Sequence, residues 1–295
     1  MKFTVGHRLA GISHIKKGTD CQDYFSYQKT EAAIIAAVAD GVGSEEHSAF
    51  GSKIVCEKAV AYCAENITLD MRDKDVLRVI ASSFNESWQE VENCARENDI
   101  DVQQCNTTLS LAVYIDGRVF YGHIGDSGIF AFFDDGKIAP VTTPQNDDEG
   151  RVFTLSSGPL KWQYGKADKK AVSLLLCTDG IWNLFFTERL AQQEEKYAVH
   201  LLHFYLNPDT IYQDYPEEDL QKWLEDDMEG INKNHSANVN FDDITMIIVC
   251  DKQIPFTRQP DDYYKKPTKE ELEKAYLEEL ERLYGHLSTD ADENT

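Results

Sequence analysis

Basic residues are scarce in this chain of 295 residues, where 29 lysines and arginines stand against 52 aspartates and glutamates, for a formal charge of −23. A surface this acidic repels nucleic acids and anionic membranes, so we expect the protein to bind neither. The sequence also lacks any apolar run near the roughly 18–20 residues that a membrane helix requires. Residues 1–11 hold neither a long apolar core nor a convincing cleavage site, so we expect no signal peptide.

Paired cysteines are missing as well. The seven cysteines are odd in number, and none belongs to a Cys-x-x-Cys pair. Most lie inside apolar runs, where a free cysteine behaves as a small hydrophobic residue. This usage predicts a reducing, cytoplasmic environment and disfavours a zinc site. What the chain does have is 42% hydrophobic residues, enough at this length for a sizeable core.

Apolar, β-branched runs predict strands, and several of these runs are joined as hairpins. Two runs flank Asp116-Gly117, a two-residue hairpin signal, and a third precedes a similar turn at Asp135-Gly136. Strands are predicted over residues 32–39, 109–115, 118–124, 128–133, 171–177 and 244–250, and helices over 48–66, 74–98, 187–204 and 217–232. Hairpins with one pair of helices inserted early and another late predict an α+β fold with antiparallel sheets, rather than a doubly wound parallel sheet.

The composition changes near residue 253, which divides the chain into a main domain, residues 1–252, and an acidic C-terminal extension, residues 253–295. Pro255, Pro260 and Pro267 interrupt the start of the extension. Apolar residues on one face then predict a helix over 269–287, and the last eight residues are predicted to be disordered. The helix either docks on the main domain or serves as a peptide that binds a partner.

Four acidic positions share one context, the end of a predicted buried strand. Asp40, Asp126 and Asp179 each close an apolar run, whereas Asp242 and Asp243 open one. An antiparallel neighbour that begins where the others end would bring all four positions to the same edge of the sheet. Carboxylates that converge there repel one another, and a divalent cation removes the repulsion. Ligands that are all oxygen favour Mg²⁺ or Mn²⁺ over zinc.

A glycine follows two of these aspartates and sharpens the chemical expectation. Gly41 lets the backbone turn sharply after Asp40, so that its carbonyl can become an additional ligand. Two cations a few ångströms apart can lower the pKa of a bridging water and orient it for in-line attack on phosphorus. Asp-Gly after a strand is also an ordinary turn, and a single instance is more often a turn than a ligand. The hypothesis therefore depends on the four positions together.

Six short motifs occur in order along residues 5–250. They are Cys21-Gln22-Asp23, Val38-Ala39-Asp40-Gly41-Val42-Gly43, Thr107-Thr108-Leu109, Gly125-Asp126-Ser127, Thr178-Asp179-Gly180 and Asp242-Asp243-Ile244-Thr245. Each motif alone is weak evidence. In this order and on these strands, they resemble the PPM/PP2C family of metal-dependent serine/threonine protein phosphatases, and in particular its bacterial branch.

The resemblance implies a PP2C-like four-layer α-β-β-α sandwich of two antiparallel sheets flanked by helices, with the metals in a cleft at one edge. It implies hydrolysis of phosphoserine and phosphothreonine in proteins by a water that bridges two Mg²⁺ or Mn²⁺ ions. Asp40 would bridge the ions and the Gly41 carbonyl would bind one of them. Asp179 and Asp242 would complete the other site, so that these three aspartates form the predicted catalytic centre.

Two further aspartates have lesser roles in this comparison. Asp23 would act through a metal-bound water, and Asp126, with Asp179, would match a weaker third metal site found in bacterial relatives. The resemblance also implies a phosphorylated protein as substrate and, for a bacterial enzyme, a cognate serine/threonine kinase. We expect a monomer.

The resemblance fails at the arginine that holds the substrate phosphate in the family. Ser13-His14-Ile15-Lys16-Lys17-Gly18 occupies that stretch, so Lys17 or Lys16 could bind the phosphate, but without a bidentate fork. His14 and His47 are candidates for the general acid, although each is more often a surface or structural histidine. A catalytically weak or inactive phosphoprotein-binding scaffold protein on the same fold is therefore the alternative function.

Three other positions bear on the site. Asp243 stands where the family motif has asparagine, which removes no predicted ligand. His123 lies inside a predicted strand and is interpreted as a core residue with satisfied hydrogen bonds. Residues 146–170, with Trp162 and Tyr164, either border the cleft or form packing surface.

Overall fold

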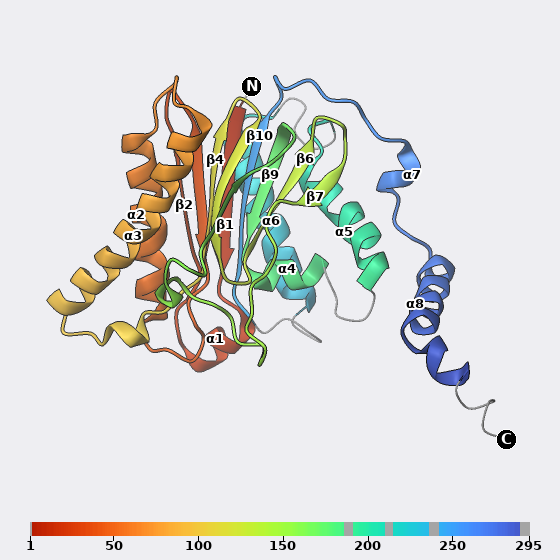
Figure 1. Cartoon of the computed structure of the whole chain (residues 1–295), viewed down its shortest axis with the longest axis horizontal. Helices are drawn as coiled ribbons and strands as arrows, with labels where there is room; N and C mark the ends of the chain where they lie inside the picture. Colours follow the sequence, from red (N-terminus) through yellow and green to blue (C-terminus); the bar gives the residue numbers. More distant parts are fainter. Residues whose placement is uncertain (1, 186–190, 210–214, 236–241, 290–295) are drawn as a thin grey trace.

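The chain is described by a computed structural model over residues 2–185, 191–209, 215–235 and 242–289. Two five-stranded antiparallel sheets pack face to face (Figure 1). Sheet A contains, in spatial order, β1 (Lys2–Leu9), β10 (Ile244–Asp251), β9 (Ala171–Cys177), β6 (Gly128–Phe133) and β7 (Ile138–Pro140). Sheet B contains β2 (Tyr24–Lys29), β3 (Ile34–Ala39), β4 (Leu109–Ile115), β5 (Arg118–Ile124) and β8 (Gln163–Lys166).

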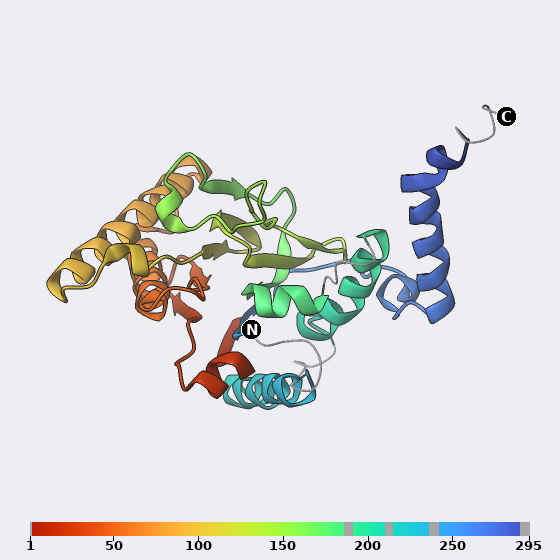
Figure 2. The same cartoon turned by 90° about the horizontal axis from the view of Figure 1, so that it is seen from below.

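Helices cover the outer face of each sheet (Figure 2). Sheet B is covered by α2 (Ser48–Asn66) and α3 (Asp73–Glu97), and sheet A by α4 (Asp179–Phe185), α5 (Ala191–Leu206) and α6 (Glu217–His235). A short helix, α1 (Ile12–Lys17), follows β1, while α7 (Asp261–Tyr264) and α8 (Lys269–Thr289) follow β10. The predicted four-layer sandwich of two antiparallel sheets flanked by helices is confirmed.

The middle strands explain why the sequence shows unbroken apolar runs instead of alternation. In β3, Ile35, Ala37 and Ala39 face the helices of sheet B. The intervening Ile34, Ala36 and Val38 face the other sheet. Since successive side chains of a strand point to opposite faces, both sets must be apolar when both faces are buried. The strand ends are therefore set by where the apolar run stops, which is directly before Asp40.

The predicted strands and helices are present, with ends that differ by a few residues. Residues 187–190 of one predicted helix lie outside the described residues. The hairpin at Asp116-Gly117 is confirmed, because both residues have positive φ (48° and 86°), as the type I′ turn requires. The sequence patterns missed β1, β2, β7, β8, α1, α4 and α7. Strand β2 carries three exposed polar positions and β8 is four residues long, so neither has a clear apolar pattern.

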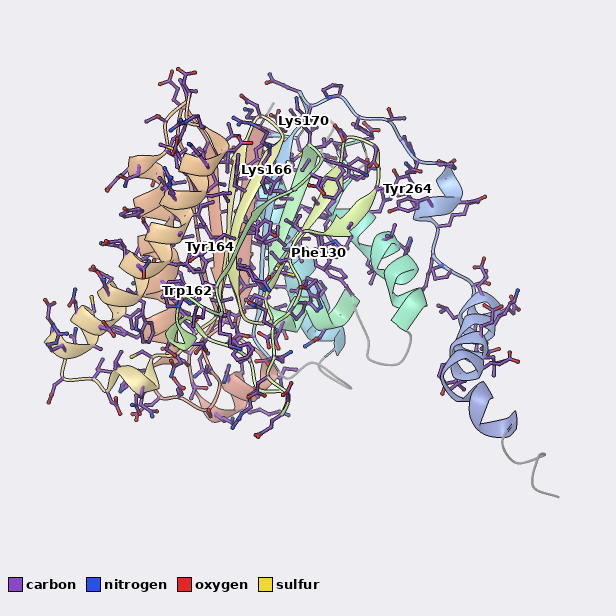
Figure 3. All side chains as sticks on the ribbon, viewed as in Figure 1. Phe130, Trp162, Tyr164, Lys166, Lys170 and Tyr264 are labelled. Carbon is purple, nitrogen blue, oxygen red and sulfur yellow. The ribbon has the colours of Figure 1, made fainter. Side chains whose placement is uncertain are left out.

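The first part of the extension packs on the β6–β7 hairpin. Tyr263 Oη accepts a hydrogen bond from the Ile138 amide (3.0 Å), and Tyr264 Oη donates one to the Gly136 carbonyl (2.6 Å). The Tyr264 ring, labelled in Figure 3, also stacks on His203 of α5 at 4.0 Å between ring centroids. Helix α8 contacts α5 and lies outside the sandwich (Figure 1). The domain boundary at residue 252 stays a prediction.

Candidate active site

Asp40 leaves β3 at the point where the neighbouring strand β4 begins. Two threonines before β4 fix its backbone: Thr107 Oγ1 and the Thr108 amide both donate to the Asp40 carbonyl (2.8 and 2.9 Å). The Asp40 amide in turn donates to Thr108 Oγ1 at 2.9 Å. These contacts occupy the backbone and leave the carboxyl group for another partner. The Thr-Thr motif therefore serves to position Asp40.

Gly41 lies where the chain passes between two other segments. Its amide donates to the Gln22 carbonyl at 3.2 Å. A Cβ atom at this position would lie 2.8 Å from both the Gln22 carbonyl oxygen and the Ser48 backbone. Only glycine fits this close approach of backbones.

Asp179 and Asp242 are brought together by two strands of sheet A. Strands β9 and β10 are antiparallel, and Cys177 pairs with Met246, so the end of one lies beside the start of the other. The Thr178 amide continues the ladder by donating to the Thr245 carbonyl at 3.2 Å. Asp179 is also the first residue of α4. The two aspartates therefore flank one pair of strand ends.

Asp126 lies in the turn between β5 of sheet B and β6 of sheet A. The preceding Gly125 has φ +109°, a conformation that favours glycine. The following Ser127 hydroxyl is hydrogen-bonded to the Thr108 hydroxyl at 3.0 Å. This contact ties the Asp126 turn to the segment that holds Asp40.

Asp40 lies within electrostatic reach of the other four predicted aspartates. Burial raises the pKa of Asp40 well above its usual range, and the charges of four neighbours raise it further: Asp23, Asp179, Asp126 and Asp242. The expectation that they share the edge of one sheet was wrong in one respect. Asp40 and Asp126 leave strands of sheet B, whereas Asp179 and Asp242 flank strands of sheet A, so the cluster spans the common end of both sheets.

The carboxyls of this cluster hold protons more tightly than free aspartate. Burial, followed by repulsion from Asp126 and Asp242, raises the pKa of Asp179 to about 7, and a hydrogen bond with Asp40 opposes the rise. Burial also raises the pKa of Asp23 well above its usual range, although the Thr178 hydroxyl donates to its Oδ2 at 2.7 Å. The mutual repulsion predicted from the sequence is therefore present.

We tested whether these residues suit divalent cations. In the described part of the chain, no three or more His, Cys, Asp or Glu side chains form a group that could hold a metal ion. Mg²⁺ usually keeps several waters and takes only one or two carboxylates, so it does not need such a group. Asp126 Oδ1 and Asp179 Oδ1 are buried without a hydrogen-bond partner among the described residues. Because an unpartnered buried oxygen is costly, a hydrated cation fits both.

A second part of the site is built around Asp243, a residue to which sequence patterns assign no role. This buried carboxylate accepts hydrogen bonds from the Gly11 amide (2.6 Å), the Gln22 amide (2.6 Å) and His14 Nδ1 (2.7 Å). His14 is buried, whereas Lys16 and Lys17 lie exposed on the same short helix. The only advance signal was that Asp243 stands where the family motif has asparagine.

Arg8 is a second residue near the site that sequence patterns missed. Its Nη1 donates to the Asp23 carbonyl, and its guanidinium lies over the Tyr24 ring, 4.6 Å from the centroid. These contacts hold it against the backbone that leads into β2. Arg8 thus supports the Asp23 segment.

The other two candidate histidines, His123 and His47, have packing or supporting roles. His123 is buried, with Nδ1 against the Ser110 hydroxyl (2.8 Å) and Nε2 against the Thr143 carbonyl (3.0 Å), and burial lowers its pKa to about 4. It is a satisfied core histidine, as predicted. His47 is half-buried before α2, where its amide donates to the Gln104 carbonyl at 3.0 Å.

Trp162 and Tyr164 belong to packing surface. Their rings lie 5.7 and 5.3 Å from the ring of Phe84 in α3, and Trp162 Nε1 donates to the Leu155 carbonyl at 3.0 Å. Figure 3 shows both on the side of the sandwich that α2 and α3 cover. Of the two interpretations of residues 146–170, packing therefore holds for these aromatic side chains.

Comparison with known proteins agrees with this geometry. The family model of protein phosphatase 2C matches residues 10–225, which is more than half of the chain. The chain belongs to the protein phosphatase 2C family. It is therefore a phosphatase of the PPM type. No curated protein matches the sequence.

Solved phosphatases share the protein phosphatase 2C fold of this chain. A bacterial serine phosphatase aligns with TM-score 0.59 and 14% identity, over 87% of this chain and 99% of its own. Serine/threonine phosphatase Stp1 from Staphylococcus aureus gives 0.58 and 13%, over 85% and 96%. The catalytic domain of serine/threonine protein phosphatase PstP, in complex with two manganese ions, gives 0.56 and 16%, over 84% and 97%. At these identities the likeness concerns the fold. Along the described residues of this phosphatase, no helix is long and apolar enough to cross a bilayer.

Proposed function

We propose that this protein phosphatase 2C member hydrolyses phosphoserine and phosphothreonine in proteins, with two divalent cations, Mg²⁺ or Mn²⁺, held by the Asp40 cluster. One observation carries the proposal: the carboxyl of Asp40 has Asp23, Asp126, Asp179 and Asp242 as its charged neighbours. The structure of PstP with two manganese ions is a relative of the same fold and supports the choice of cations.

The proposed ligands divide between the two sheets. Asp40 and the Gly41 carbonyl, both leaving sheet B, would serve one cation, and Asp40 would also face the second. Asp179 and Asp242, from sheet A, would complete the second site. Two cations bound there would supply Lewis acidity and a water acidic enough to attack phosphorus in line.

Two residues would act less directly. Asp126 and Asp179 each have a buried, unpartnered carboxylate oxygen, which supports a third, weaker cation between them. Asp23 is fully buried and hydrogen-bonded by Thr178, which supports contact with a cation through water. The hydroxyl of Thr178, in a neighbouring motif, would hold the Asp23 carboxylate still.

An active enzyme is favoured over an inactive scaffold. Loss of catalysis in a metal-dependent enzyme would first remove the carboxylates that hold the cations, and all five are present and close together. Its substrate would be a phosphorylated protein, paired with a cognate kinase that adds the phosphate. We also propose that the protein is a monomer. A location in the cytoplasm is proposed as well, and the free cysteines in the structure agree with such a reducing compartment.

The test is hydrolysis of a phosphothreonine peptide by the full chain with Mn²⁺, Mg²⁺ or EDTA. We expect turnover with Mn²⁺ or Mg²⁺ and none with EDTA. Asp40→Asn and Asp179→Asn should both abolish it, while Asp20→Asn, at an exposed position outside the cluster, should not. No turnover with any divalent metal, or full activity in both cluster variants, would overturn the proposal.

A further inference from the structure

The Asp243 carboxylate accepts three short hydrogen bonds from other segments of the chain. Its Oδ1 accepts from the Gly11 amide and from His14 Nδ1, and its Oδ2 accepts from the Gln22 amide, all at 2.6–2.7 Å. The side chain is 2% exposed. Three donors around a buried carboxylate are the arrangement that satisfies its charged form. Asp243 therefore joins both ends of the α1 segment to the start of β10.

These contacts also fix which nitrogen of His14 is available. A carboxylate that already accepts from two backbone amides has no proton to give, so Nδ1 of the ring must donate. Nε2 is then the nitrogen left for another group. The ring itself is held in place, because its side chain is 9% exposed and one edge is bonded to Asp243. The Asp243 carboxylate thus decides both the tautomer and the orientation of the His14 ring.

His14 lies next to the proposed metal ligands. The Asp243 amide donates to Asp242 Oδ1 at 3.0 Å, and Gln22, which is bonded to Asp243, directly precedes Asp23. Desolvation raises the pKa of Asp242, whereas the hydrogen bond from the Asp243 amide lowers it, and His14 is close enough to lower it as well. The ring therefore lies at the edge of the carboxylate cluster.

The two lysines of the segment are poorer phosphate ligands by comparison. Lys16 and Lys17 are exposed in the last turn of α1, directly before Gly18. A long, exposed ammonium chain loses more conformational freedom on binding than a ring that is already fixed. Arg8 is held against the Asp23 carbonyl and the Tyr24 ring. His14 is the basic residue of α1 that is buried and oriented.

We propose that His14 binds the phosphoryl oxygens of the substrate through Nε2, and that Asp243 is the positioning residue that holds the ring for this contact. The inference rests on the proposed phosphatase function and names the group that does the work of the absent arginine. A phosphate that binds as its monoanion donates its P–O–H to the Nε2 lone pair, while Nδ1–H stays on Asp243. No bond is made or broken in this binding step.

Kinetics of the full chain with Mn²⁺ and a phosphothreonine peptide give the first test. His14→Ala should raise KM for the peptide and the inhibition constant of inorganic phosphate by roughly 10- to 100-fold, the value of a charged hydrogen bond. Free imidazole should restore part of the lost activity. Lys16→Met and Lys17→Met test the competing lysines, and each should change KM by less than about 3-fold. Lys53→Met, at an exposed position of α2, is the control. An unchanged KM and phosphate inhibition in His14→Ala would overturn the proposal.

A double-mutant cycle tests whether Asp243 acts through His14. Asp243→Asn restores the residue found in the family motif, so the fold has a precedent with this side chain. If Asp243 acts through the ring, the substitution should raise KM in the wild-type background and add nothing in the His14→Ala background. Additive effects would show that Asp243 only supports the backbone, and would refute its positioning role.

A measurement without turnover separates this inference from the proposed function. In ¹⁵N NMR spectra of the histidine rings, His14 should show a protonated Nδ1, and inorganic phosphate should shift its Nε2 resonance. The shift should be lost in Asp243→Asn, and the resonances of His47 and His123 should not move. If the wild type hydrolyses no phosphopeptide, the proposed function fails. If phosphate leaves the Nε2 resonance of His14 unmoved, the inference fails whether or not the enzyme is active.

Discussion

The two sides of the candidate active site are built by different means. The carboxylate side is made of strand ends, where ladder pairing positions Asp40 and Asp179 and threonine hydroxyls also hold Asp40. The side proposed to bind phosphate, called the phosphate side, is made of α1, a helix of six residues, which is tied to the rest of the site through Asp243. A side held by two sheets should tolerate loss of one contact better than a side held by one carboxylate.

The largest expected effect is on the carboxylate side. Asp40→Asn removes the carboxylate at the centre of the cluster, so kcat with Mn²⁺ should fall by on the order of 10³-fold. In metal-free protein the same change should raise the melting temperature, because it removes a carboxyl group whose ionisation is opposed by desolvation and by four neighbouring aspartates. Asp20→Asn is the exposed control in both assays. A lower melting temperature without metal would mean that Asp40 stabilises the metal-free fold, which would contradict repulsion among the clustered aspartates.

The next effect concerns pH and metal together. Since the folded-state pKa of Asp179 is about 7, the metal-free native state binds more protons than the unfolded state between about pH 4 and pH 7. Its free energy of unfolding should therefore decrease as the pH rises through this window, and the stabilisation by Mn²⁺ should increase over the same range. Thermal unfolding at pH 5, 6 and 7, with EDTA or Mn²⁺, measures both trends. A melting temperature in EDTA that stays level or rises from pH 5 to pH 7 would contradict the raised pKa.

A smaller effect tests how far the carboxylate side depends on the hydroxyl group of Thr178. Thr178 Oγ1 donates to Asp23 Oδ2 (2.7 Å) and accepts from the Thr245 amide (3.1 Å). Thr178→Val keeps the shape but leaves both partners unsatisfied, which should lower the free energy of unfolding by about 1–3 kcal/mol. Denaturant unfolding with EDTA measures it, with the exposed Thr143→Val as the matched control. Equal stability of both variants would show that β9 and β10 hold Asp23 without this bridge.

The same difference explains what sequence patterns could predict. The ends of β3, β5, β9 and β10 follow from where apolar runs stop, so the aspartates beside them were found by position alone. The edge strand β1 was missed because its partner is a side chain as well as a strand: Gln221 of α6 accepts from the Gly6 amide and donates to its carbonyl (3.2 and 2.9 Å). No local pattern encodes such a contact.

Asp243 shows the limit most clearly. Its three partners lie 221, 229 and 232 residues away along the chain, so the role of the residue appears only when β10 and α1 are folded together. The sequence could mark Asp243 as a departure from the family asparagine. It could not show that the added charge is satisfied by His14 and two backbone amides.

The smallest expected effect tests the phosphate side through its backbone. Gly18 ends α1 with φ +70°, and its amide donates to the Ile15 carbonyl while the Thr19 amide donates to the His14 carbonyl. Gly18→Ala meets no atom within 4 Å, so the cost is only the left-handed backbone, about 1 kcal/mol. Gly150→Ala is a matched control, because Gly150 has φ +80° and equally open surroundings but lies outside α1. Both variants should lose similar stability in denaturant unfolding.

Their kinetics should nevertheless differ. Loosening the end of α1 should disturb the ring of His14, so Gly18→Ala should raise KM for a phosphothreonine peptide by about 2- to 5-fold, as expected for a loss of up to 1 kcal/mol. Gly150→Ala should leave KM unchanged, and Gly18→Asn, which tolerates a positive φ, should fall between the wild type and Gly18→Ala. If both alanine variants raise KM alike, the phosphate side is no more sensitive than the rest of the chain. The contrast between the two sides of the site would then be wrong, because α1 would not depend on a single carboxylate to hold its place.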